Sequence, residues 1–174
     1  MLLSTGSTGS EGTFVESLRA LCNAQGTFRS VVMVPACLQD SCLINEIISS
    51  AMSNKDILII KDFVPVRPLL SYVDVLICHG GQLSVQCGLA AGLPIVGVPS
   101  QADQCFNLQN LEVCNAGVCI LPVDWKEAHI REVLLSVGSG SSYKTGAMKL
   151  QREFLQNASG AEKVATIVWN TLTC

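Results

Sequence analysis

Residues 73–99, "VDVLICHGGQLSVQCGLAAGLPIVGVP", contain the pattern that decides the fold. A strand that is apolar except at Asp74 is expected over residues 73–78, and the glycine pair after it marks a sharp exit. A helix is expected over residues 83–91, where Gly92 and the proline that follows it shortly afterwards form a typical helix stop. "PIVGVP" then has the composition of a second buried strand. This order of elements predicts a βαβ unit with parallel strands.

The rest of the chain alternates strands and helices in the same way. Further strands are expected in "MLLS", "FRSVVMVPA", "DILIIKDFV" and "AGVCILPV". Helices are expected over residues 13–24, 103–115, 125–136, 143–155 and 161–172, with a short one in "INEIISSAM". Strands that are apolar throughout are typical of parallel sheets covered on both faces. We therefore predict one α/β domain over residues 1–174, a doubly wound parallel sheet of Rossmann-like type.

Composition excludes several classes of function. The 174 residues carry a net charge of −3 with a pI near 5.3, so no basic field is available for nucleic acid. No apolar run reaches the roughly 18 residues that span a bilayer, and the start lacks the features of a signal peptide. A soluble, cytoplasmic chain is expected. Because 49% of the residues are hydrophobic, part of the surface is expected to be covered by a partner.

Three loops follow strands at positions where an open parallel sheet binds its ligands. They are residues 4–12, 79–84 and 99–104, and each leads into a helix. Ligands of such sheets lie outside the carboxyl ends of the strands. We expect the three loops to share one edge of the sheet.

The first two loops have the composition of an anion site. "STGSTGSEG" offers three glycines and five hydroxyl groups before a helix, although a flexible surface loop has a similar composition. "HGGQLS" places His79, backbone N–H groups and Ser84 near one point, which suits a diphosphate. The alternative is an ordinary turn histidine beside a capped helix.

The third loop, "PSQADQCFN", offers an acid and amides at a helix start. Asp103 can accept hydrogen bonds and Gln104 can both accept and donate them, a combination that matches adjacent sugar hydroxyls. Asp103 could equally serve only to cap the helix. Both interpretations are open from the residues alone.

Two rival interpretations use the cysteines. A metal site built on Cys78, His79 and Cys87 is disfavoured because neighbours in a strand point to opposite faces, and the chain has only two histidines. A thiol nucleophile, Cys87 or Cys105 with His79 as its base, is disfavoured because Cys87 is expected on the buried side of its helix. The nine cysteines include no CxxC pair and are expected to act mainly as small apolar residues.

The three loops together resemble the C-terminal, donor-binding half of the GT-B glycosyltransferases of family GT1. The resemblance rests on "LLSTGSTGS", on "KDFVPVRPLLSYVDVLICHGG" and above all on "GLAAGLPIVGVPSQADQCFNLQNLEVCNAGVCI". It implies the following nucleotide-sugar-binding residues: Ser7, Phe63, Val64, His79, Gly80, Gly81, Ser84, Asp103, Gln104 and Asn107.

The resemblance also implies the part of the donor that each group would contact. Phe63 and the Val64 backbone would border the nucleotide base. Residues 79–84, together with Ser7, would bind the diphosphate. Asp103 and Gln104 would hold the sugar hydroxyls, with Asn107 close by or structural.

The mechanism that the resemblance implies is sugar transfer from a nucleotide diphosphate sugar (UDP- or dTDP-sugar) to a small-molecule or lipid acceptor. No cofactor or metal is expected, because His79, loop amides and a helix N-terminus would stabilise the leaving charge. The acceptor pocket and the general base would belong to an N-terminal domain or a separate subunit, and the chain is expected to be inactive without it.

Two positions depart from the family pattern. Leu83 stands where Gly or Asn is usual, and Cys87 replaces a Glu that plant members use on the ribose. A degenerate, non-catalytic nucleotide-sugar-binding module is therefore an alternative, and a nucleotide-sugar epimerase of the same fold is another.

Overall fold

The computed structural model describes residues 1–6, 10–24, 26–138, 142–156 and 160–172, and its centre is a six-stranded parallel sheet. The strands are β1 (Leu2–Ser4), β2 (Ser30–Met33), β3 (Ile57–Ile60), β4 (Leu76–Cys78), β5 (Ile95–Gly97) and β6 (Gly117–Cys119). Their order across the sheet is β3-β2-β1-β4-β5-β6, and every neighbouring pair is parallel. The predicted doubly wound, Rossmann-like fold is confirmed.

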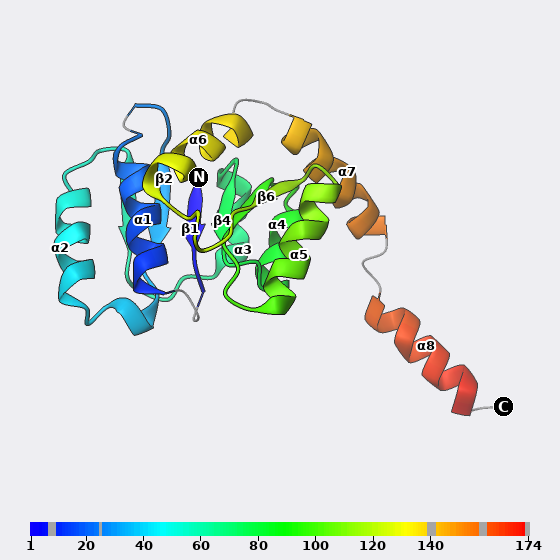
Figure 1. The fold of residues 1–174 in the computed structure, drawn as a ribbon. Helices are drawn as coiled ribbons and strands as arrows, with labels where there is room; N and C mark the ends of the chain where they lie inside the picture. Colours follow the sequence, from blue (N-terminus) through cyan, green and yellow to red (C-terminus); the bar gives the residue numbers. More distant parts are fainter. Residues whose placement is uncertain (7–9, 25, 139–141, 157–159, 173–174) are drawn as a thin grey trace.

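The helices cover both faces of the sheet (Figure 1). They are α1 (Glu11–Cys22), α2 (Cys42–Ala51), α3 (Val66–Leu69), α4 (Gln82–Ala90), α5 (Ala102–Val113), α6 (Glu127–Gly138), α7 (Ser142–Gln156) and α8 (Gly160–Leu172), with 3-10 turns η1 (Ala36–Leu38) and η2 (Leu70–Tyr72). Neighbouring strand residues point to opposite faces, so Leu3 joins the core under α1, α2 and α6 while Leu2 joins the core under α4 and α5. Apolar burial on both faces holds the layers together.

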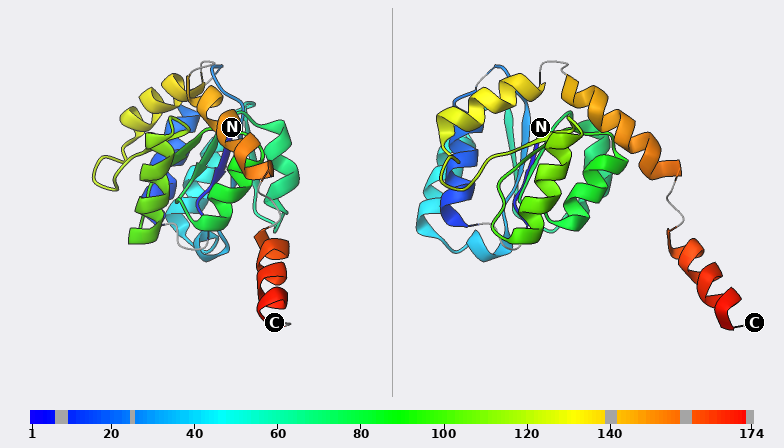
Figure 2. Two further views of the ribbon diagram at one scale, coloured as in Figure 1. Left: turned by 90° about the vertical axis from the view of Figure 1, so that its right-hand side faces the viewer. Right: turned by 45° about the vertical axis from the view of Figure 1, so that its right-hand side comes forward.

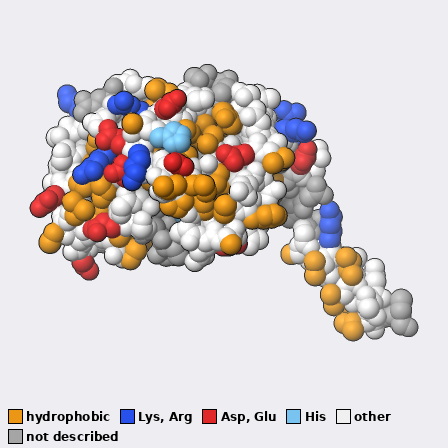
Figure 3. Space-filling model, in the orientation of Figure 1, with side chains coloured by type: hydrophobic (Ala, Val, Ile, Leu, Met, Phe, Trp, Pro, Cys, Tyr) orange, Lys and Arg blue, Asp and Glu red, His pale blue; other side chains and the backbone are white. Residues whose placement is uncertain are grey.

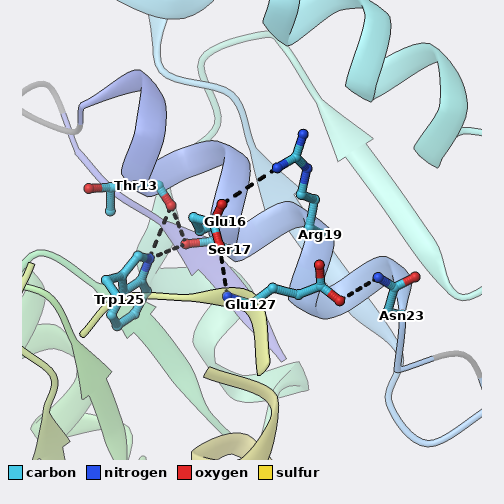
Figure 4. Close-up of polar contacts among 7 residues, drawn as sticks. All are labelled: Thr13, Glu16, Ser17, Arg19, Asn23, Trp125 and Glu127. Carbon is cyan, nitrogen blue, oxygen red and sulfur yellow. Dashed lines mark hydrogen bonds and ion pairs between the residues drawn. The ribbon is translucent and has the colours of Figure 1, made fainter. Parts of the chain in front are cut away.

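The segment between β6 and α6 is fixed against α1 by polar contacts (Figure 4). The indole N–H of Trp125 donates to the Thr13 carbonyl and to Ser17 Oγ, both at 3.1 Å. The Glu127 backbone N–H donates to Glu16 Oε2 at 2.8 Å. The sequence pattern predicts that this helix begins at Trp125. In the structure Trp125 is buried against α1, and α6 begins at Glu127.

Helix α7 packs on α4 and binds its C-terminal end. Lys144 Nζ donates to the Gly92 carbonyl at 2.9 Å, and Gln151 Nε2 donates to the Ala90 carbonyl at 2.9 Å. These side chains satisfy carbonyl groups at the end of α4 that have no partner within the helix. The charge of Lys144 is also favourable there, because the C-terminal end of the α4 dipole is negative. Helix α8 extends away from the body of the molecule (Figure 2). Among the described residues, no helix is long and apolar enough to cross a membrane.

Candidate functional site

The three loops that follow β1, β4 and β5 meet at one edge of the sheet, as the sequence predicts. These strands are neighbours and run in parallel, so their carboxyl ends lie side by side. The chain leaves β1 for a helix on one face and leaves β4 for a helix on the other. This divergence between β1 and β4 is the position where open α/β sheets bind ligands.

The imidazole of His79 lies between two glycines. A Cβ atom placed on Gly6 would stand 2.4 Å from Cε1 of the ring, and one placed on Gly81 would stand 2.4 Å from Nε2. Gly6 also has a φ of +65°, a conformation that favours glycine. The first and second loops therefore hold the ring jointly, and we call Gly6, His79 and Gly81 the His79 site.

Burial lowers the pKa of His79 below its usual value, while the Asp103 carboxylate and the Thr5 backbone act in the opposite direction. Nδ1 of the ring is buried and has no hydrogen-bond partner among the described residues. Since the pKa of a free histidine is about 6.5, the lowered pKa makes the ring neutral at pH 7. An anion bound at the ring would raise this pKa again.

Gly80 shapes the turn between β4 and α4. Its φ is +82°, and a Cβ atom there would stand 2.7 Å from the Leu108 side chain. Asn107 Nδ2 donates to the Gly80 carbonyl at 3.0 Å, which fastens the turn to α5. Asn107 thus makes a structural contact, and its predicted place near the donor sugar stays a prediction.

The N-terminus of α4 is available to a ligand. Gly81 is its N-cap, and no side chain caps it. Ser84 is half-buried in the first turn, and Leu83 is 69% exposed beside it. Uncapped N–H groups and the positive end of the helix dipole favour an anion here, next to His79.

Asp103 and Gln104 are neighbours in sequence, but the structure uses them differently. Asp103 is exposed in the first turn of α5. Gln104 is only 3% exposed, and its Oε1 accepts from the backbone N–H and the hydroxyl of Ser100, at 2.8 and 3.0 Å. The Gln104 amide thus stabilises the third loop through Ser100. A contact between Gln104 and the donor sugar is still only a prediction.

An apolar cavity of about 490 Å³ opens at the carboxyl ends of β1, β2 and β3. Phe63 lines it and is 94% exposed, while Val64 beside it is half-buried. Gly6 lines this cavity and is also part of the His79 site. The residues after β2, Pro35 to Cys37, also line the cavity, and the sequence analysis missed them because only a strand-ending proline marks that segment.

The remaining predicted positions are placed as follows. Ser7 lies outside the described residues. Cys78 and Cys87 are both buried in the core under α4 and α5, which confirms the expected orientation of Cys87. Burial raises the pKa of the Cys78 thiol to about 11, so it is protonated and inert at neutral pH.

Replacing Gly81 with alanine is expected to weaken anion binding several-fold, because the new methyl group would occupy the place of His79 Nε2. The backbone at Gly81 has a φ of −61°, so no backbone strain contributes to the effect. Titration calorimetry with thymidine diphosphate would measure it. Gly160→Ala is the matched control, since nothing lies within 4 Å of a Cβ atom there. Equal affinities of the two variants would contradict the role of the His79 site.

A Rossmann-like parallel sheet whose chain diverges between β1 and β4 is typical of the class of nucleotide-binding α/β domains. Within this class, the family model for the C-terminal domain of erythromycin biosynthesis protein CIII-like proteins matches residues 48–169. The chain belongs to this family.

Curated relatives are glycosyltransferases. The chain is 30% identical over 101 residues to a PGL/p-HBAD biosynthesis glycosyltransferase of Mycobacterium tuberculosis, covering 58% of this chain and 24% of that protein. It is 31% identical over 102 residues to the NDP-glycosyltransferase YjiC of Bacillus licheniformis, covering 59% and 26% respectively. The chain thus matches about a quarter of the length of these relatives.

Solved structures share the fold. The glycotransferase of kitacinnamycin superposes with a TM-score of 0.79 at 21% identity, covering 97% of this chain and 42% of that one. The spinosyn rhamnosyltransferase SpnG complexed with thymidine diphosphate superposes with a TM-score of 0.71 at 18% identity, covering 89% and 41%. The neighbours are glycosyltransferases of the GT-B fold.

Proposed function

We propose that this chain binds a nucleotide diphosphate sugar and forms the donor-binding half of a metal-independent glycosyltransferase. The observation that carries the proposal is the His79 site beside the uncapped N-terminus of α4. A structural neighbour, SpnG, has been solved with thymidine diphosphate, which supports a ligand of this class. The acceptor would be a small molecule or a lipid.

The donor would extend across the three loops. The nucleotide base would enter the apolar cavity beside Phe63. Gly6 would lie between the nucleotide base and the diphosphate, because it lines this cavity and also contacts His79. The diphosphate would lie between His79 and the first turn of α4. The sugar would then reach Asp103, whose exposed carboxylate can accept hydrogen bonds from hydroxyl groups.

The chemistry at this half is stabilisation of the leaving group. When the bond between the sugar and the diphosphate breaks, negative charge grows on the diphosphate oxygens. The hydrogen bonds that His79 and the N–H groups of α4 donate to these oxygens would strengthen as the charge develops. They would therefore lower the activation barrier of sugar transfer. Preorganisation by Gly6 and Gly81 keeps the ring in place for this step.

The general base and the acceptor pocket would come from an N-terminal acceptor-binding domain or subunit. Support comes from α8, which has an exposed apolar face formed by Val164, Ile167, Val168, Trp169 and Leu172. Figure 3 shows hydrophobic side chains gathered along this helix. An apolar helix face of this kind is typical of a surface that is covered by another part of a protein. Without such a part, the chain would bind donor and turn over little.

The proposal is tested by titrating the chain with thymidine diphosphate and, separately, with UDP. Saturable binding of at least one of them is expected, with much weaker binding of the corresponding monophosphate, because the diphosphate carries the contacts to the His79 site. Inorganic phosphate is the control for non-specific anion binding. If millimolar nucleoside diphosphate gave no saturable heat, the proposed function would be wrong.

A further inference from the structure

The first two turns of α5 bind two of the three loops at once. Gln104 Oε1 accepts hydrogen bonds from the backbone N–H of Ser100 at 2.8 Å and from its hydroxyl at 3.0 Å, which fastens the third loop. Asn107 Nδ2 donates to the Gly80 carbonyl at 3.0 Å, which fastens the second loop. The two amides are three residues apart, so they lie on the same side of the helix.

The partners of the Gln104 amide fix its orientation. A backbone N–H can only donate, so the atom that faces Ser100 N must be the carbonyl oxygen of the amide. Nε2 then lies on the other side of the amide and donates to Gln101 Oε1 at 3.3 Å. The side chain of Gln104 is only 3% exposed, and both of its polar atoms have partners inside the chain. This is the arrangement of a structural amide.

Both contacts of α5 lead to His79. Gly80 follows His79 directly in the chain, and a Cβ atom on Gly80 would stand 2.7 Å from the Leu108 side chain and 2.9 Å from the Gln104 carbonyl oxygen. Ser100 and His79 line the same small cavity of about 90 Å³. The second loop therefore carries the imidazole, and the third loop forms part of the wall beside it.

We propose that Gln104 and Asn107 are positioning residues for the His79 site: the two amides hold the second and third loops at a fixed spacing, and this spacing keeps the imidazole where a diphosphate can meet it. The inference rests on the proposed function for the identity of the ligand. It differs from the contact with sugar hydroxyls that the resemblance implies for Gln104.

The two roles of Gln104 affect different ligands. A side chain that contacts only the donor sugar cannot change the affinity for thymidine diphosphate, because that nucleotide has no sugar attached to its diphosphate. A side chain that holds the loops around His79 changes the affinity for thymidine diphosphate and for nucleotide sugars alike. Thymidine diphosphate is therefore the probe that separates the two roles.

The first test is titration calorimetry with thymidine diphosphate on Gln104→Met and Asn107→Leu, which keep the approximate side-chain size and remove the hydrogen bonds. Each variant should bind about 3- to 10-fold more weakly than the wild type, the factor that corresponds to the loss of an ordinary hydrogen bond. Gln109→Met and Asn110→Leu are matched controls on the same helix. Gln109 is exposed, and the Asn110 amide donates to the Phe106 carbonyl of its own helix at 2.8 Å. Both controls should bind as the wild type does.

Ser100 offers a milder test that does not change a buried residue. Ser100→Ala removes one of the two hydrogen bonds to Gln104, and Ser100→Thr keeps both donors on this exposed residue. Ser100→Ala should weaken binding of thymidine diphosphate about twofold, and Ser100→Thr should restore it. In Gln104→Met, where the acceptor is already gone, Ser100→Ala should have no further effect.

The second test reads the position of the imidazole in the free chain from the NMR signal of the His79 Cε1–H group. Gln104→Met and Asn107→Leu should shift this signal, whereas the signal of His129, which lies on α6, should stay in place as an internal reference. A lower global stability alone would not shift the His79 signal of the folded chain. This readout therefore distinguishes a positioning role from a merely stabilising one.

Wild-type affinity for thymidine diphosphate in both Gln104→Met and Asn107→Leu would overturn the inference and leave the proposed function intact. An unchanged His79 signal in both variants would overturn it as well. If the wild type bound no nucleoside diphosphate, the proposed function would be wrong, and the His79 signal would still decide whether the two amides position the ring.

Discussion

Replacing His79 with alanine is expected to lower the affinity of the chain for thymidine diphosphate by about 10- to 100-fold. A hydrogen bond to a charged group contributes about 1.5–3 kcal/mol, and every 1.4 kcal/mol is a factor of ten in affinity. The loss should exceed that of Gly81→Ala, in which the ring is displaced but still present. Titration calorimetry at pH 7 measures both variants under the same conditions.

The control for this prediction is His129→Ala, which removes the only other histidine of the chain. His129 lies on α6, and its Nδ1 contacts the Asp124 carbonyl. That variant should bind as the wild type does. Similar affinities of His79→Ala and the wild type would mean that the diphosphate binds elsewhere, and the assignment of the crevice between β1 and β4 would fail.

The fold was predictable because its signals are local. Each strand is a short apolar run, and the stop of α4 at Gly92 and Pro94 can be recognised in the sequence. Helices α3 and η2 were not predicted, because "VPVRPLLSY" contains two prolines and too few residues for a helical period. Strand β4 is also shorter than expected: it begins at Leu76, after η2, rather than at Val73.

The candidate site was predictable only in part, for a related reason. The meeting of the three loops follows from parallel strand order, which the sequence pattern indicates. The contact of His79 with Gly6 and Gly81 depends on how two loops pack together, and no spacing in the sequence encodes it. Gln104 shows the same limit, because its bonds to Ser100 depend on the conformation of the third loop.

The largest loss of stability is expected from Gly146→Ala in α7. A Cβ atom at Gly146 would stand 2.1 Å from the Asn115 carbonyl oxygen and 2.7 Å from that of Cys114. Both are backbone atoms, so no side-chain rotation can relieve the contact. Asn115 has a φ of 51°, and this left-handed turn after α5 has little freedom to move aside. Helix α7 would have to shift away from the body.

That shift would disturb contacts that α7 makes elsewhere. Ala147 is fully buried, and Lys144 and Gln151 bind the carbonyls at the end of α4. We expect the free energy of unfolding to fall by about 1–3 kcal/mol, as for other overpacked sites, although alanine alone favours a helix by about 1 kcal/mol over glycine. Urea denaturation followed by circular dichroism would measure the change. Gly160→Ala, whose Cβ meets nothing within 4 Å, should unfold at the same urea concentration as the wild type or slightly higher. Coincident unfolding curves for the two variants would show that α7 does not pack closely on the turn at Asn115.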